Sequence, residues 1–160
     1  MDLVELSKKQ AVDGMEMFLR NFSHVPDDKL NWTPTPTSKS PLRISAHTAL
    51  YAGRFAAMIR NRALPAPDNL DEWVASNNAE ETAIASREEM ERVFRTGTAE
   101  VLAALDSLTI EEVEMTLQSD QGWSIPMKQV MALPGWHATL HLGQIDYLQT
   151  CWDDQMIYVG

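Results

Sequence analysis

The sequence predicts an all-α fold, a four-helix bundle in a single domain that spans residues 1–160. Four segments carry apolar residues at spacings of three, four and seven, as one buried face of a helix requires. Polar stretches that contain proline join these segments, and no run alternates apolar and polar residues convincingly enough to predict a strand. Four helices of about 20 residues each are the content of a four-helix bundle.

The first segment, residues 3–23, is expected to be a helix with one apolar stripe. Pro26 lies just beyond its end, where a proline commonly follows a helix. A polar connection that contains two prolines follows over residues 32–40. The stripe consists of Val4, Ala11, Met15, Phe18 and Phe22.

The second helix is expected to begin at Ser40 or Pro41 and to end before Pro65. A serine can cap a helix, and a proline suits the first helical position. A long linker from Asp68 to Ala85 should follow, with one short helical turn over residues 70–74. The face of the helix that we expect to be buried carries Ile44, His47, Tyr51, Phe55 and Met58.

The third helix should open at Ser86, because Glu89 stands three residues later in a capping-box pattern. Residues 119–124 are expected to form a loop. The buried face of this helix is expected to comprise Met90, Phe94, Gly97, Val101, Leu105 and Leu108.

The fourth helix is expected to begin near Pro126 and to run to about Trp152. Pro134 lies inside it and lacks the N–H of one backbone hydrogen bond, which predicts a kink one turn before His137. The linker between the second and third helices, roughly 20 residues, can run back along a helix of about 30 Å, since extended chain covers ~3.3 Å per residue. The connection between the first two helices is nearly as long, so linker length only suggests the order of the helices.

Charge and composition exclude several classes of function. The net charge is −10, and such an acidic surface repels phosphate backbones, so we expect no nucleic-acid partner. No cluster of Lys and Arg would anchor the chain on a membrane, and no apolar run reaches the roughly 18 residues of a membrane span. We also find no signal peptide. The single cysteine, Cys151, rules out an internal disulfide and favours a cytoplasmic location.

Three of the four histidines are candidate ligands of one metal ion. His137 and His141 are four residues apart, so their imidazoles lie on one face of the last helix, about one turn apart. His47 lies on the apolar face of the second helix and could supply a third nitrogen from a facing helix. The alternative is that these are buried histidines that are simply hydrogen-bonded.

The residues around this pattern narrow its chemistry. Ala138 follows His137, where a zinc protease of the HExxH type has its catalytic glutamate, so that mechanism is excluded. The paired Glu-x-x-His motifs of di-iron bundles are also missing from the sequence. Three neutral nitrogens without a protein carboxylate would leave the full charge on the ion and at least one open coordination position, which suits zinc or nickel.

Other polar side chains receive more ordinary interpretations. Gln144 and Tyr51 could hydrogen-bond a ligand, but we favour the interpretation that they are polar groups at a helix boundary. His24 is expected to be a cation at the end of the first helix. Cys151 is expected to be buried and inert, and Trp136 to lie in the core or an interface. The acidic pairs are expected to stabilise helix N-termini and solubility: Asp27–Asp28, Glu80–Glu81, Glu88–Glu89 and Glu111–Glu112.

The chain resembles the DinB-like (YfiT-like) metal-binding four-helix bundles. A single histidine, His47, follows a Trp-x-Pro loop at residues 32–34, and the last helix carries His137-x-x-x-His141 followed by Gly-Gln-Ile at 143–145. The two elements lie about 90 residues apart, so the resemblance spans nearly the whole chain. One departure is Leu142, since an arginine is more common before the Gly-Gln pair; this leaves a more apolar environment and argues against an anionic-substrate role at that position.

The resemblance implies the helix order up-down-down-up, one divalent metal ion, nickel or zinc, on His47, His137 and His141, and frequent homodimers. Family members include thiol-dependent S-transferases, a mycothiol-dependent maleylpyruvate isomerase and proteins described only as metal-dependent hydrolases. We therefore expect a metal-dependent enzyme with a small-molecule substrate. Thiol transfer fits better than hydrolysis, since a thiolate needs no separate protein base. The alternatives are a non-enzymatic bundle with a structural or vestigial metal site, and a bundle without metal.

Overall fold

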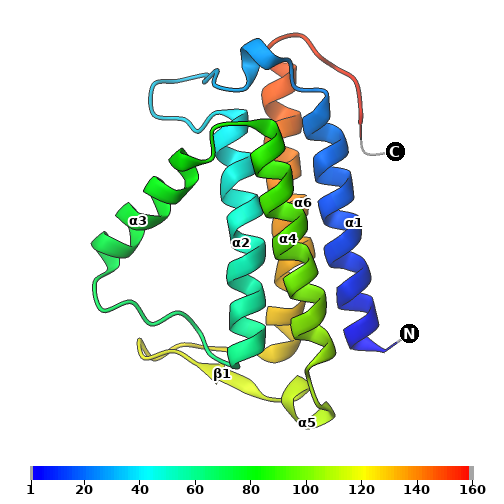
Figure 1. The fold of residues 1–160 in the computed structure, drawn as a ribbon, viewed down its shortest axis with the longest axis vertical. Helices are drawn as coiled ribbons and strands as arrows, with labels where there is room; N and C mark the ends of the chain where they lie inside the picture. The colour runs from blue at the N-terminus through cyan, green and yellow to red at the C-terminus, as the bar shows by residue number, and fades with distance from the viewer. Residues whose placement is uncertain (1, 159–160) are drawn as a thin grey trace.

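Four long helices lie side by side in the computed structural model, which describes residues 2–158 (Figure 1). The starts of three of them follow from their caps. The side chains of Asp2, Ser40 and Ser86 each accept a hydrogen bond from a backbone N–H in the first turn of the helix that follows. The predicted helix starts at Ser40–Pro41 and Ser86 are therefore confirmed. The bounds of the helices are Leu3–Ser23 for α1, Pro41–Asn61 for α2, Arg87–Asp106 for α4 and Met127–Thr150 for α6.

The helices pack in two close pairs, α2 with α4 and α1 with α6. Glycines allow the close approach. A Cβ on Gly97 of α4 would lie 2.8 Å from the backbone nitrogen of Gly53 in α2, and a Cβ on Gly135 of α6 would lie 2.6 Å from the carbonyl oxygen of Gln10 in α1. The two pairs are joined by contacts between α2 and α6, which therefore pack against each other inside the bundle. The largest fully buried side chains of the core include Phe18, Phe22, Ile59, Met90, Leu105, Met127 and Ile145.

A further helix, α3 (Leu70–Ala83), occupies the long linker, so the expectation of a single turn over residues 70–74 was wrong. The sequence pattern did not predict α3 because the helix has no apolar stripe. Its side chains Leu70 and Val74 are exposed, and within residues 70–83, all of which are described, Glu81 alone is buried. The helix begins instead at a cap, since the Asn69 side chain accepts hydrogen bonds from two backbone N–H groups. Figure 1 shows α3 leading the chain back along the bundle, a course that fits the expected up-down-down-up order.

The connection from α4 to α6 also contains structure that was not expected. A short helix, α5 (Ile110–Val113), begins with a capping box formed by Thr109 and Glu112. Two three-residue strands of the described chain, β1 (Thr116–Gln118) and β2 (Ser124–Pro126), then form an antiparallel hairpin. Leu117 is buried under the bundle. The prediction of no strand was therefore wrong, because three residues are too few to show the alternation of a strand.

Two smaller features complete the description of the fold. A 3₁₀ turn, η1, covers Asp27–Lys29 after α1. Among residues 2–158, none of the helices combines the length and apolarity that crossing a bilayer requires.

Candidate metal centre

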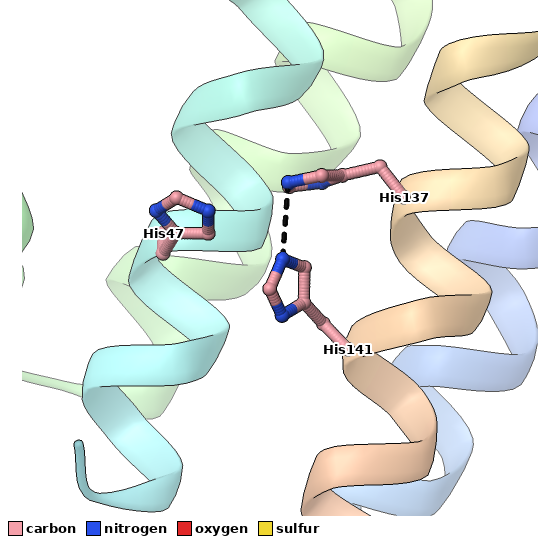
Figure 2. Close-up of side chains that lie close together, drawn as sticks. All are labelled: His47, His137 and His141. Atoms are coloured by element: carbon pink, nitrogen blue, oxygen red, sulfur yellow. Dashed lines mark hydrogen bonds between the residues drawn. The ribbon is translucent and has the colours of Figure 1, made fainter. Parts of the chain in front are cut away.

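The three predicted histidines meet between α2 and α6. His47 projects from α2, and His137 and His141 project from one face of α6 toward it (Figure 2). One ring nitrogen from each of them lies within 4.8 Å of those of the other two. The helical spacing of four residues and the α2–α6 contact therefore bring together all three residues that the sequence singled out.

The distances in this cluster suit a shared ion. The Nε2 atoms of His137 and His141 are 3.0 Å apart, and the ring centroid of His47 lies 5.2 Å from that of His137 and 4.9 Å from that of His141. Nitrogens that share a tetrahedral ion at 2.0–2.1 Å stand about 3.3 Å apart. The Nε2 atoms of His137 and His141 are already close to that spacing, and a ring nitrogen of His47 lies within 4.8 Å of both residues' nitrogens.

A buried carboxylate orients His47. The Nδ1–H of His47 donates to Oε1 of Glu81 at 2.7 Å. This bond places the proton on Nδ1 and leaves Nε2 with its lone pair, which is the atom a metal would take. In Figure 2 the second ring nitrogen of His47 is on the side of His137 and His141.

Glu81 is held by three partners on α2 and the loop before it. Its side chain is almost fully buried, at 3% exposed, and its Oε2 accepts from Lys39 Nζ at 2.8 Å and from Arg43 Nη2 at 3.3 Å. Burial alone would raise the pKa of this carboxyl, but the hydrogen bonds from Lys39 and His47 outweigh it and lower the pKa. Glu81 is therefore ionised at neutral pH. The assignment of Glu81 to a helix start and solubility was wrong.

Gln144 orients a second histidine. The Nδ1–H of His141 donates to Oε1 of Gln144 at 2.6 Å, which again leaves Nε2 free of its proton. The interpretation of Gln144 as a simple boundary residue was therefore wrong. Tyr51 contacts two of the three histidines through its ring, with centroid distances of 4.4 Å to His47 and 5.1 Å to His137. The guanidinium carbon of Arg54 lies over the Tyr51 ring, 4.7 Å from its centroid.

The histidines are kept neutral by their surroundings. Burial, followed by the proximity of His141 and His47, lowers the pKa of His137 to about 3. Burial is also the main cause that lowers the pKa values of His47 and His141, and it outweighs the opposing hydrogen bonds to Glu81 and Gln144. Neutral imidazole is the form that binds a metal, so the three side chains need not release a proton before they bind one.

Comparison with known proteins identifies the family. The family model of the DinB superfamily matches residues 10–145. The chain belongs to the DinB superfamily. No curated protein gives a significant match to the sequence.

Solved structures share the DinB fold with this chain. The mycothiol-dependent maleylpyruvate isomerase superposes with a TM-score of 0.70 at 13% identity, over 91% of this chain and 61% of the isomerase. YfiT from Bacillus subtilis, described as a probable metal-dependent hydrolase with an unusual four-helix bundle topology, gives a TM-score of 0.68 at 16% identity, over 93% of this chain and 89% of YfiT. A second DinB-like protein from Bacillus subtilis gives a TM-score of 0.68 at 14% identity, over 95% and 94% of the two chains. Such low identities establish the fold alone.

Three further side chains lie outside this centre of the DinB bundle. His24 is the C-cap residue of α1, so its expected position at the helix end is confirmed, while its role as a cation there stays a prediction. Its ring stacks on Tyr158 with ring centroids 3.8 Å apart. Cys151 is exposed at the end of α6, so the expectation that it is buried was wrong. Trp136 is 60% exposed and does not lie in the core, which leaves the interface interpretation.

Proposed function

We propose that this protein is a metal-dependent enzyme in which His47, His137 and His141 hold one divalent ion, nickel or zinc, with an open coordination position. The observation that carries the proposal is the convergence of three neutral imidazole nitrogens within 4.8 Å. Two of the three rings are fixed through Nδ1, by Glu81 and by Gln144, in the tautomer that offers Nε2.

The number of ligands supports an open, catalytic site. In the part of the chain that the structure describes, the group of possible ligands has three members. Structural zinc sites are closed by four protein ligands, whereas catalytic sites combine three with an exchangeable position. This favours an enzyme over the alternative, a non-enzymatic bundle in which the ion only joins α2 to α6.

Each residue of the centre has a distinct role in the proposed site. A divalent ion bound there would lower the pKa of a water or thiol at the open position. The partial burial of the three rings keeps them neutral, Glu81 holds the proton of His47 on Nδ1, and Gln144 holds the orientation of His141. Glu81 contributes its negative charge beside the site without being a ligand.

A thiol transfer is the reaction that these residues support best. Among residues 2–158, the hydrogen bonds and ion pairs bring no carboxylate other than Glu81 to the three histidines, and Glu81 already accepts from three donors. Hydrolysis of an amide needs a proton donor for the leaving group, whereas thiolate attack on an electrophile does not. The mycothiol dependence of the similarly folded isomerase supports a low-molecular-weight thiol as one substrate.

Metal analysis of the purified protein tests the centre. We expect close to one nickel or zinc per chain in untagged protein, and loss of that metal in His141→Ala. His24→Ala is the matched control, because it removes a histidine that lies outside the cluster. Full metal occupancy in His141→Ala would contradict the proposal. A transfer assay with several low-molecular-weight thiols, before and after chelation, then tests the reaction.

We further propose a homodimer in the cytoplasm. Support for the dimer comes from Trp136, which is 60% exposed beside the groove between α1 and α6 that also contains Met17. Light scattering should give the mass of a dimer for the wild type and of a monomer for Trp136→Glu, and a monomeric wild type would contradict this part. The cytoplasmic location is supported by the single, exposed cysteine.

A further inference from the structure

A pocket of about 510 Å³ lies beside the three histidines, between the N-terminal end of α2, the loop before it and the C-terminal half of α6. Its volume falls in the range of small-molecule sites. Apolar side chains form most of its wall: Pro34, Ile44, Leu140 and Leu148. Such a wall suits the apolar body of a small organic molecule.

The pocket lies close to the histidine cluster along both α2 and α6. Ile44 stands three residues before His47, and Gln144 stands three residues after His141, so the pocket begins about one helical turn, roughly 5 Å, from the cluster. Gln144 lines the pocket and also bonds His141 at 2.6 Å. The three histidines themselves do not line the pocket, so Gln144 is the residue that the pocket and the centre share.

The pocket has a positive character that is unusual for this acidic chain. Lys39 lines it, and no Asp or Glu does. Four other pockets lined by residues 2–158 each include at least one acidic side chain, and the chain as a whole carries a net charge of −10. Of these five pockets, the one beside the histidines therefore has the lining that repels an anion least.

The ion pairs at Glu81 leave positive charge in excess. Lys39 and Arg43 both donate to this one carboxylate, so two cations share a single negative charge. The Lys39 side chain is 42% exposed, and its ammonium group has three N–H donors, of which the bond to Glu81 uses one. Gln144 uses its carbonyl oxygen on His141, so its NH₂ group is the part that can donate to a ligand.

We propose that this pocket binds a small amphipathic anion, with its acidic group on Lys39 and Gln144 and its apolar body against Ile44 and Leu140. The inference rests on the proposed function in one respect only, namely that the bound molecule is the substrate that the metal centre acts on. Leu142, which stands where the resemblance leads us to expect an arginine, does not line the pocket.

Two fluorescent probes that differ in charge test this proposal. 8-Anilinonaphthalene-1-sulfonate is an amphipathic anion, and N-phenyl-1-naphthylamine has the same rings without the acid. Both are titrated into the full, chelator-treated chain, so that probe binding is measured independently of metal. If the protein binds the anionic probe but no metal, the proposed metal centre is contradicted and the proposed pocket is not. If it binds metal but not the anionic probe, the proposed pocket is contradicted and the metal centre is not.

Gly143→Leu tests the location of the probe. Gly143 lines the pocket, and a Cβ added there meets no atom within 4 Å, so a leucine can occupy the pocket without displacing the helices. We expect it to weaken binding of both probes by about tenfold or more, because it takes up the apolar surface they would bury. Ala132→Leu, in the groove between α1 and α6, is the control and should leave both affinities unchanged. Equal affinity of wild type and Gly143→Leu would overturn the proposal.

Lys39→Gln tests the charge. We expect up to about fivefold weaker binding of the sulfonate and unchanged binding of the neutral probe, as for a partly exposed ion pair. Lys128→Gln is the matched control, because Lys128 is 45% exposed and also pairs with one glutamate, Glu114, but lies away from the pocket. If Lys39→Gln weakens both probes equally, or neither, the assignment of an anionic ligand is wrong.

Discussion

Replacing Glu81 by alanine should weaken metal binding although Glu81 is not a ligand. The carboxylate accepts the Nδ1–H of His47 at 2.7 Å, and Glu81 is 2% exposed, so this bond is shielded from solvent in the native protein. Without it, the His47 ring loses the bond that fixes its tautomer and its orientation. Lys39 and Arg43, whose side chains are 42% and 29% exposed, can turn toward solvent, so the main loss falls on His47.

The size of the effect follows from the nature of this bond. Removing the hydrogen-bond partner of a metal-binding histidine typically lowers metal affinity by about 10- to 100-fold. Glu81→Ala should lie in this range. Glu81→Gln should cost less than about tenfold, because an amide oxygen still accepts the hydrogen bond, while a charge-assisted bond is roughly twice as strong as a neutral one.

Competition with a chromophoric chelator measures the affinity, with zinc and with nickel at neutral pH. Glu80→Ala is the matched control: it is the preceding residue of α3, it pairs with Arg54 at 2.9 Å, and its side chain is 52% exposed. Its affinity should stay within about twofold of the wild type, since exposed ion pairs contribute little. If Glu81→Ala and Glu80→Ala bind metal equally well, the orientation of His47 does not depend on Glu81 and the reasoning fails.

Three further predictions concern packing, pH and thiol reactivity. Gly135→Ala should lower the free energy of unfolding by about 1–3 kcal/mol, because its Cβ would meet the α1 backbone at 2.6 Å, whereas Gly143→Ala, which meets nothing, should raise it by about 0.5–1 kcal/mol; thermal melts of both variants decide. The hydrogen bond from Arg62 lowers the pKa of Glu112 below its ordinary 4.5. This pair therefore stabilises the fold above pH 4.5, and its contribution is lost as the pH falls through the lowered pKa. The melting temperature of Glu112→Gln should lie below that of the wild type at neutral pH and converge with it in acid. Cys151 should react with Ellman's reagent in the native protein without loss of metal, and a thiol that reacts only after denaturation would contradict its exposed position.

The four long helices could be predicted because their information is local. Stripes such as the one that contains Phe18 and Phe22 repeat with the period of a helix, and Ser40 and Ser86 mark starts through side chains that bond the first turn. The three histidines of the candidate centre could be predicted equally well. The spacing of His137 and His141 directly predicts that their side chains lie close together, since residues four apart share one face of a helix.

The hydrogen-bond partners of these histidines were harder to predict. Glu81 is 34 residues from His47 in sequence. It lies on α3, a helix that has no apolar stripe from which it could have been predicted. Nothing in its neighbourhood distinguishes it from the adjacent Glu80, which is exposed. Only the fold, which brings the end of α3 over the start of α2, separates a buried partner of a histidine from a solvated charge.

The polar attachment of α3 has a consequence for how the protein responds to metal. A helix that buries one residue, and that residue a glutamate, opens at much lower free energy than the packed helices, so its amides should exchange with solvent as a separate cooperative unit. That unit and the ion would both act on His47, one through Nδ1 and the other through Nε2. Ordering of α3 and binding of the ion are then thermodynamically linked, and each favours the other by the same free energy. The apparent affinity for the ion therefore includes the free energy of ordering α3, although no atom of α3 would contact the ion.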